Sequence, residues 1–485
     1  MPNSKRPRSE LLPPNASAMV ESMRAHGYTL STAIADLVDN SISAGASTVW
    51  IDVRWDGSKS WIAVSDDGRG MTEAQLSQAM RLGSQSPLVE RGAADLGRFG
   101  LGLKTASFSQ CRRLTVFSKP EGAATSVRRW DLDHLADPRS DGWELLLEPH
   151  PDSHADVDRI ESVSSGTTVL WEALDRIVPS QQATDESMRK HFFAQVAALE
   201  EQLGMVFHRY LDGARPLIIL LNEQPITLWD PFARRHSATT KTPEEALRLP
   251  GQPGTVRVKG YVLPHRDKLT DQDHRELGGP KGWNAQQGFY LYRNDRLIVA
   301  GSWLGLGSSR PWTQEEHYKL ARIELDVPNS LDHAWQLDVK KSHATPPPQL
   351  RDHLLGLAQN VRIQAREVYR HRGKYMSSSK SAAAPVRAWK RGTRRGQAVY
   401  MVDRSHPIVA AVLHRLDTTD RQHVDVMLKI IEETVPVEQI WIDTAETPDG
   451  HRAPFSDTTT SELRRAIRRL YTRYRRFRWP IARRS

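Results

Sequence analysis

The sequence has very little cysteine and no long apolar run, and each shortage excludes certain kinds of site or protein. Cys111 is the one cysteine in 485 residues, so an intramolecular disulfide and a cysteine-based metal site are excluded. No apolar stretch approaches the roughly 20 residues that span a bilayer. The opening MPNSKRPRSELLPPN also lacks the apolar core of a signal peptide. We expect a cytoplasmic protein that makes no use of a membrane.

Acidic residues are missing from two segments of the C-terminal quarter. Residues 370–395 carry nine Lys and Arg, and residues 463–485 carry ten arginines, with no Asp or Glu in either segment. The net charge is +12 from Arg370 onward and +9 for the whole chain, which leaves −3 for residues 1–369. Because 396–462 is acidic, two basic blocks flank an acidic module.

The length and the hydrophobic pattern predict several domains. Residues 16–45 show helical spacing with a break at 26–27, and 48–55 and 60–68 alternate like a hairpin around an Asp-Gly turn. The glycine-bearing stretch 83–97 is typical of a mobile loop. A helical pattern at 183–211 precedes strand patterns at 215–232, 255–264 and 288–301, which indicates a second α+β domain. Residues 371–396 have the composition of a basic linker.

ADLVDNS at 35–41 offers an acid and an amide on one helical face, because Asp36 and Asn40 are four residues apart. A carboxylate there can orient a water molecule, and an asparagine oxygen is a suitable ligand for Mg²⁺. Taken alone, such a pair is more often part of a solvated helix face.

Three further segments have the composition of a nucleotide site. In SDDGRGM, at 65–71, Asp66 can accept a hydrogen bond from an adenine amino group. GRFGLGLKTAS, at 97–107, combines exposed amides with a cation, as phosphate-binding loops do. SSGTTVLW, at 164–171, begins a strand with paired threonines. Each has an ordinary alternative when read singly: a turn, a glycine loop and an edge strand.

Taken together and in this order, the four segments resemble the GHKL ATPases (gyrase, heat-shock chaperone, histidine kinase and MutL) and their Bergerat fold, over about residues 25–172. The resemblance implies binding of Mg²⁺ and ATP, with Asn40 as the metal ligand, Asp66 as the adenine reader and Thr167 as its helper. It implies that Gly68, Gly70 and Met71 form a backbone platform for the adenine. It also implies that the phosphate-binding lid consists of Gly97, Phe99, Gly100, Leu101, Gly102 and Lys104.

One position departs from the family pattern. Most hydrolysing members have glutamate where this chain has Asp36, which is one methylene shorter. We therefore expect ATP hydrolysis to be slow, or to be assisted by Asp39.

The second domain resembles the ribosomal-S5-like transducer domain of MutL, MORC and gyrase-type proteins, through GFYLYRNDRLIVAGSW at 288–303. The resemblance makes Lys341 or Lys340, in WQLDVKKSHATPP at 335–347, a catalytic cation that reaches the γ-phosphate. The alternative is a pair of exposed lysines after a strand. The predicted α+β architecture is an ATP-binding domain at 1–175, a transducer at 176–370, a linker at 371–396 and a small α-rich domain at 397–485.

The segment SELRRAIRRLYTRYRRF at 461–477 predicts an amphipathic, arginine-rich helix. Such a helix can bind nucleic-acid phosphates, an anionic membrane or an acidic protein, or pack on its acidic neighbour 396–462. DRQHVDVMLKIIEE at 420–433 is faintly similar to an endonuclease motif of some MutL proteins. It lacks the second acidic position and the downstream cysteines, so we predict a plain helix.

Among GHKL functions, a histidine kinase is disfavoured because it needs a phosphorylatable histidine in a dimerisation segment ahead of the ATP site. A MutL-like or MORC-like clamp fits better: a homodimer that closes on ATP, acts on DNA through the basic C-terminal region and works with protein partners in repair or antiviral defence. The alternative is a chaperone-like ATPase that remodels a protein.

Overall fold

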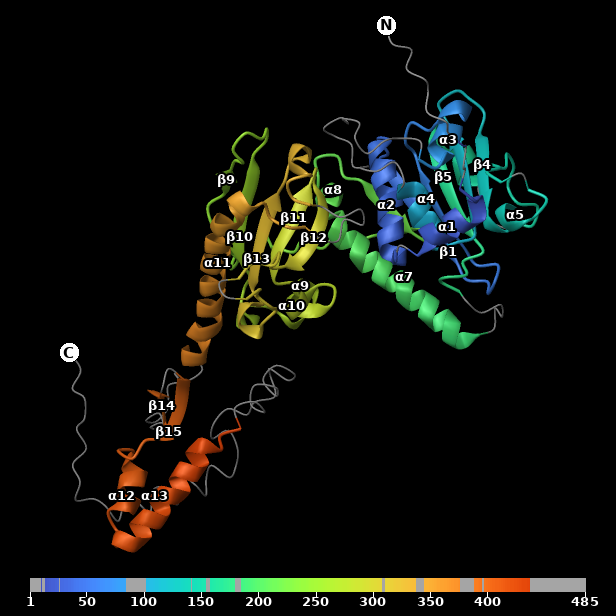
Figure 1. Ribbon diagram of the computed structural model, residues 1–485. Helices are drawn as coiled ribbons and strands as arrows, with labels where there is room; N and C mark the ends of the chain where they lie inside the picture. The colour runs from blue at the N-terminus through green and yellow to red at the C-terminus, as the bar shows by residue number, and fades with distance from the viewer. Residues whose placement is uncertain are drawn as a thin grey trace, which may run out of the picture. The chain divides into compact units, whose positions relative to one another are not determined.

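A computed structural model describes residues 10, 14–25, 27–83, 102–140, 142–153, 158–178, 185–307, 310–336, 344–375, 388–394 and 397–436. The chain divides into two compact units, Met1–His371 and Arg372–Ser485. Within the first unit, two lobes each have their own sheet and hydrophobic core (Figure 1). We call residues 14–226 the first lobe and residues 229–371 the second lobe.

The first lobe is built on a seven-stranded mixed sheet in the order β4-β3-β5-β2-β1-β6-β7. Its neighbouring strands are antiparallel except for β1 and β6, which run parallel. Strand β2 is buried along its whole length. The strands are β1 (Thr48–Arg54), β2 (Trp61–Asp66), β3 (Arg113–Lys119), β4 (Ser126–Asp131), β5 (Gly166–Glu172), β6 (Ile218–Leu221) and β7 (Gln224–Pro225).

The helices of the first lobe bury apolar faces against this sheet. Helix α2 begins with a capping box between Thr29 and Thr32 and packs against α4 and α7. The predicted helix pair and the hairpin of β1 and β2 are both confirmed. The helices are α1 (Ala16–Arg24), α2 (Leu30–Ser43), α3 (Glu73–Met80), α4 (Gly102–Phe108), α5 (Leu132–Ala136), α6 (Asp158–Ser162), α7 (Glu186–Val206) and α8 (His208–Leu211).

The first lobe extends beyond residue 175, where we had expected the first domain to end. Strand β6 pairs with the outer edge of β1, with Thr48 opposite Ile218. Helix α7 contributes Phe192, Leu199 and Leu203 to the same hydrophobic core. The physical reason is that β1 would otherwise leave its backbone groups unpaired at a sheet edge.

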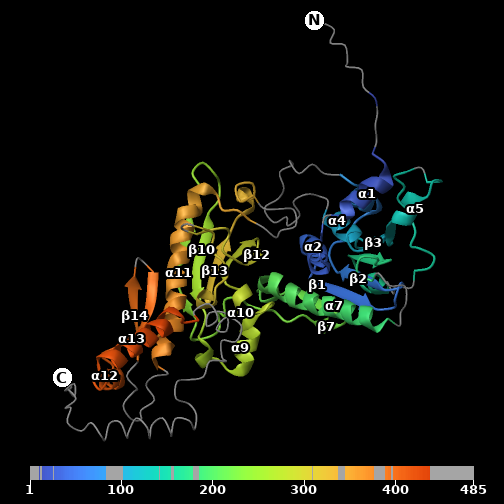
Figure 2. The same cartoon turned by 60° about the horizontal axis from the view of Figure 1, so that its bottom comes forward.

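The second lobe contains a six-stranded mixed sheet, in which β12-β11-β13-β10-β8 are neighbours and β9 pairs with β10. Helix α11 lies along β10 in both views (Figures 1 and 2), and the approach is close because a side chain at Gly260 would collide with Val361. The elements are β8 (Thr240–Lys241), β9 (Glu245–Leu247), β10 (Val256–Val262), α9 (Asp271–Gly278), α10 (Gly282–Ala285), β11 (Gly288–Arg293), β12 (Arg296–Ser302), β13 (Ala321–Asp326) and α11 (Pro348–Tyr375).

In the second unit, β14 (Trp389–Arg394) and β15 (Gln397–Val402) form an antiparallel hairpin, followed by α12 (Pro407–Leu413) and α13 (Thr418–Glu433). The segment that we expected to be a linker, 371–396, therefore contributes a strand, because its last residues find a partner in β15. Helix α13 confirms the helix predicted at 420–433, whereas the predicted helix at 461–477 lies outside the described residues. None of the helices that the structure describes is long and apolar enough to cross a membrane.

Candidate functional site

Helix α2 carries the acid and the amide that the sequence singled out. The side chain of Asp36 is buried and accepts a hydrogen bond from the Tyr28 hydroxyl, with 3.1 Å between Tyr28 Oη and Asp36 Oδ2. One turn later, Asn40 is exposed. The helix thus holds a fixed carboxylate at Asp36 and presents the Asn40 amide to solvent, where a hydrated cation can reach it.

Tyr28 had not been identified from the sequence. It precedes the N-cap of α2, and its carbonyl oxygen accepts a hydrogen bond from Gln110 Nε2 at 3.2 Å. No local pattern signals this role, because the hydroxyl reaches Asp36 only once the chain has turned into the helix. Gly102, at the start of α4, also lies near Asp36: a Cβ atom there would be 3.7 Å from Oδ2. The described end of the predicted lid segment is therefore next to the predicted base.

Asp66 ends β2 as a buried carboxylate with two hydrogen-bond donors inside the lobe. Ser41 Oγ donates to Oδ2 at 2.8 Å, and the Gly68 backbone N–H donates to Oδ1 at 2.9 Å. Burial raises the pKa of Asp66, while the hydrogen bonds from Ser41 and Gly68 act in the opposite direction. Ser41 follows Asn40 directly, so α2 contacts Asp66 at the same helical turn that presents the amide.

Thr167 lies beside Asp66 on the neighbouring strand. The two residues are directly opposite each other in the pairing of β2 with β5, and the backbone N–H of Thr167 opposes, to a small extent, the rise in the pKa of Asp66 that burial causes. The Thr167 hydroxyl is 2.8 Å from Ser118 Oγ, which also accepts a hydrogen bond from the Met71 N–H at 2.9 Å. Ser118 therefore joins two of the predicted residues, and no local sequence pattern indicates this role.

The structure gives Gly68 and Gly70 packing reasons to be glycine. A Cβ atom at Gly68 would lie 2.8 Å from Ala44 Cβ and 2.9 Å from Asp66 Oδ1. Gly70 has a φ of +65°, and a Cβ atom there would lie 2.1 Å from the Lys119 carbonyl oxygen. Their predicted role as a platform for adenine remains a prediction.

Lys104 is directed toward the end of another helix. Its ammonium group donates to the carbonyl oxygens of Ala79 at 2.8 Å and Arg81 at 2.9 Å, where α3 ends. A cation at a helix C-terminus satisfies carbonyls that have no partner within the helix. Burial lowers the pKa of Lys104 to about 8, so it is mostly charged at neutral pH. Contact with a phosphate, as predicted, requires the side chain to leave these carbonyls.

Several predicted residues lie outside the described part of the chain: Gly97, Phe99, Gly100 and Leu101 of the lid segment, and Lys340 and Lys341 of the second lobe. Their assignments to the phosphates therefore stay predictions.

Asp39, considered above as an aid to hydrolysis, is placed differently from Asp36. Its side chain is 2% exposed, and Oδ1 pairs with Arg296 Nε of the second lobe at 3.2 Å. The structure therefore places the Asp39 carboxylate in a contact between the lobes. Its assistance to hydrolysis remains a prediction.

Residues 28–167 match the family described as "Histidine kinase-, DNA gyrase B-, and HSP90-like ATPase". This range contains α2, Asp66 and Thr167, which form the site described above. Over this range the first lobe is similar to the GHKL ATPases. Its resemblance to this family over about residues 25–172, predicted from the four segments, is confirmed.

Two curated relatives are similar to part of this chain. The DNA mismatch repair protein MutL of Rhodospirillum rubrum is 33% identical over 138 residues, which are 27% of this chain and 19% of the relative. The ATPase morc-1 of Caenorhabditis elegans is 30% identical over 113 residues, or 23% of this chain and 13% of the relative. The matched region thus spans about a fifth or less of each relative's length.

Among solved structures, the N-terminal domain of a DNA repair protein superposes with a TM-score of 0.42 at 15% identity. The superposition covers 74% of this chain and 99% of the chain of that structure.

Proposed function

We propose that the chain is an ATP-dependent, dimerising molecular switch that binds and slowly hydrolyses Mg-ATP and acts on DNA as a clamp. The observation that carries this proposal is the position of Asp66. A buried carboxylate at the end of β2 is joined through Ser41 to α2, which also bears Asp36 and Asn40. In a GHKL lobe, this arrangement supports an adenine contact at one end and a metal and water site at the other.

Each residue is assigned a separate task. Asp66 accepts a hydrogen bond from the adenine amino group, and its ionised form is favoured by the donors Ser41 and Gly68. Asn40 supplies one oxygen ligand to Mg²⁺, while water and phosphate oxygens complete the coordination. The residues present fit such an ion, because the exposed Asn40 amide offers an oxygen, the donor type that Mg²⁺ prefers.

Slow hydrolysis is expected from the position of Asp36. Its carboxylate is fixed by Tyr28, and as an aspartate it reaches less far than the glutamate that is usual in the family. Lys341 or Lys340 would contact the γ-phosphate in the closed state and stabilise charge on the phosphoryl oxygens.

The DNA part of the proposal rests on two supports. Relatives of the first lobe are named as DNA mismatch repair proteins, and the segments 370–395 and 463–485 hold nineteen basic residues and no acidic ones. Such blocks bind a phosphate backbone without reading its sequence. Repair and antiviral defence are both compatible with a clamp of this kind.

A second candidate function is the ATP-dependent remodelling of a protein partner, and helix α13 favours it. Val426, Met427, Ile430 and Ile431 are between 42% and 58% exposed, and their spacing places the last three on one side of the helix. An apolar face of this kind is a typical contact surface for another protein.

Sedimentation velocity distinguishes the two functions. The full chain is measured alone, with Mg²⁺ and a non-hydrolysable ATP analogue, and with the analogue plus closed circular duplex DNA. A clamp becomes a dimer with the analogue and stays on the closed DNA at salt concentrations that release it from linear DNA. A protein remodeller dimerises without DNA retention, and a chain that binds no nucleotide contradicts both functions.

A further inference from the structure

An ion pair connects the two lobes directly beside the proposed nucleotide residues. Arg296 Nε, at the start of β12, is 3.2 Å from Asp39 Oδ1 on α2. The side chains are 7% and 2% exposed, so water reaches neither of them freely. Asp39 immediately precedes Asn40, and the two partners are 257 positions apart in the sequence.

The turn that carries Arg296 is tightly constrained. Asn294 and Asp295 have positive φ angles of 47° and 62°, as the tight turns of hairpins require. Helix α8 of the first lobe contacts both residues: Arg209 pairs with Asp295 at 3.1 Å, and the Tyr210 hydroxyl donates to the Asn294 carbonyl oxygen. The turn therefore cannot shift without disturbing its contacts with α8.

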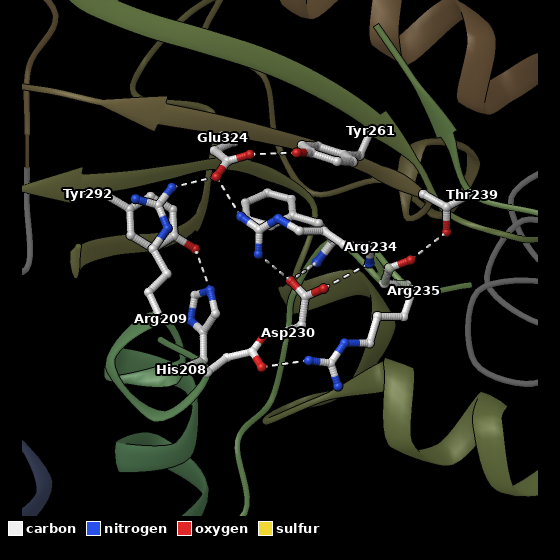
Figure 3. A network of polar contacts seen from close by, with 12 residues as sticks. His208, Arg209, Asp230, Arg234, Arg235, Thr239, Tyr261, Tyr292 and Glu324 are labelled. Carbon is white, nitrogen blue, oxygen red and sulfur yellow. Dashed lines mark hydrogen bonds and ion pairs between the residues drawn. The ribbon is translucent and has the colours of Figure 1, made fainter. Parts of the chain in front are cut away.

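Helix α8 is in turn anchored to the second sheet by a buried polar network (Figure 3). The Arg209 guanidinium lies 3.5 Å from the centre of the Tyr292 ring and pairs with Asp326 at 2.5 Å and with Glu324. Burial would raise the pKa of Glu324, but Arg234 and Arg209 hold it below its ordinary value.

His208 adds a neutral hydrogen-bonded link to the same network. Burial lowers its pKa to about 4, so the ring is uncharged at neutral pH. Nδ1 is 2.8 Å from the Met205 carbonyl oxygen and carries the proton, and Nε2 then accepts from the Tyr292 hydroxyl at 3.3 Å. Helix α8, the turn and the second sheet are thereby tied into one assembly.

We infer that Arg296 is a positioning residue for the nucleotide site, and that the Asp39–Arg296 pair couples nucleotide binding on α2 to the orientation of the second lobe. The inference rests on the proposed function, since it assumes that Asn40 and Asp66 contact Mg-ATP. Nucleotide binding restrains α2 at Asn40 and, through Ser41, at Asp66. On α2, Asp39 lies between Asp36, the predicted base, and Asn40. A displacement of α2 therefore reaches β12 through the Asp39 carboxylate, which contacts Arg296.

A contribution to stability does not by itself explain why a buried ion pair joins the two lobes. A buried ion pair often contributes little net stability, although removal of one partner is strongly unfavourable because the other charge stays buried. A pair that spans two lobes has a second consequence, because it is made only while the lobes keep one relative position. Coupling between two sites is commonly about 5- to 150-fold in affinity, which is within the range that one such contact can supply.

Four variants separate coupling from folding. Arg296→Met keeps the apolar stem and removes the donor, whereas Arg296→Gln retains a nitrogen near the position of Nε and can still donate to Asp39. Arg24→Met is the control: Arg24 is also buried, and its ion pair, 2.5 Å to Asp175, stays inside the first lobe. Asp39→Asn/Arg296→Met removes both charges and serves if the single variant does not fold.

Amide hydrogen exchange of the full chain, with and without Mg²⁺ and a non-hydrolysable ATP analogue, provides the measurement. In the wild type, the analogue should protect the peptides covering α2 and also those covering β11 and β12. In Arg296→Met, protection should remain at α2 and be lost at β11 and β12. Affinity for the analogue should fall by about fivefold or more, the usual range of coupling between two sites, and turnover should fall with it.

The expected control results are equally specific. Arg24→Met should lower the melting temperature and still transmit protection to β12, and Arg296→Gln should restore transmission at least in part. Equal transmission in the wild type and in Arg296→Met, or in the charge-free double variant, would overturn the inference and leave the ATPase proposal intact. A wild type that shows no protection at α2 refutes the proposed nucleotide site itself.

Discussion

Replacement of Asp66 by asparagine should weaken ATP binding without weakening the fold. Asparagine has the same size and one acceptor fewer. It can keep the hydrogen bond from the Gly68 N–H to Oδ1, while its amide donates to Ser41 Oγ, whose own proton can turn toward the Leu37 carbonyl oxygen at 3.3 Å. The contacts of residue 66 with Gly68 and Ser41 are both kept, so Asp66→Asn should fold as the wild type does.

The stability effect has a definite sign. Burial raises the pKa of Asp66, so the folded state holds this proton more tightly than the unfolded state does. Stability is therefore lost as the pH rises from the ordinary aspartate pKa through the raised one, and the charged carboxylate is unfavourable at neutral pH. Asparagine avoids that penalty, so the nucleotide-free variant should melt at the same temperature as the wild type or higher.

The affinity effect is opposite in sign. A hydrogen bond to a charged group contributes about 1.5–3 kcal/mol, so its loss should reduce ATP affinity about 10- to 160-fold. With ATP at about 100 times the wild-type Kd, the wild type gains about 2.7 kcal/mol of stability. A variant that binds about 50 times more weakly gains only about 0.65 kcal/mol at the same concentration.

Asp67 provides the matched control for this prediction. It accepts hydrogen bonds from the Ser47 and Thr48 backbone N–H groups at 2.7 and 2.9 Å. Partial burial is the largest single influence on its pKa and raises it, but the hydrogen bonds from Ser47 and Thr48 together hold the pKa below the ordinary value. Its contribution to stability is present above the ordinary pKa and is lost as the pH falls through the lowered one. Asp67→Asn should thus melt at a lower temperature and bind ATP normally.

Calorimetric titration and thermal melts with and without Mg-ATP measure both effects. Wild-type ATP affinity in Asp66→Asn would refute the adenine contact. A lower melting temperature of nucleotide-free Asp66→Asn would refute the argument from burial.

Three other predictions concern turnover, stability and DNA binding. Asp36→Ala should retain ATP affinity and lose turnover in a steady-state ATPase assay, and wild-type turnover would place the base elsewhere. Gly70→Ala should lower the free energy of unfolding, measured by urea titration, by more than the roughly 1–2 kcal/mol expected for a positive φ alone, because its Cβ also meets Lys119. Gly45→Ala, with a φ of +78° and nothing within 4 Å, isolates the conformational part, and equal losses would exclude the steric contribution. Truncation before Ser461 should lower affinity for all duplex sequences and flatten its salt dependence in fluorescence anisotropy titrations, and an unchanged slope would remove the arginine-rich segment from the DNA contact.

Local sequence patterns predicted the parts of the site that lie close together in the chain. Asp36 and Asn40 follow from helical spacing, and the hairpin that ends at Asp66 follows from strand alternation and an Asp-Gly turn. Tyr28 and Ser118 were missed because each acts through a contact that only the folded chain creates. Arg296 was part of a recognised segment, but nothing in that segment names Asp39 as its partner across 257 positions.

Lys104 shows a different limit of sequence reasoning. A lysine after a glycine-rich loop suggested a phosphate contact, yet a lysine also suits the C-terminal carbonyls of a helix. The sequence cannot distinguish these two acceptors, because α3 ends more than twenty residues earlier and reaches Lys104 only through packing. The domain boundary shows the same limit, since the pairing of β6 with β1 is also a long-range contact.

Helix α2 carries three consecutive residues with three different contacts. Successive helical residues point about 100° apart, so Asp39 can contact the second lobe while Asn40 faces solvent and Ser41 contacts Asp66. The opposite face is packed, with Ile34 and Val38 fully buried, and close packing transmits displacement instead of absorbing it. A ligand that restrains α2 at Asn40 therefore restrains Asp39 as well, and the response of the second lobe follows from three consecutive side chains on one rigid helix.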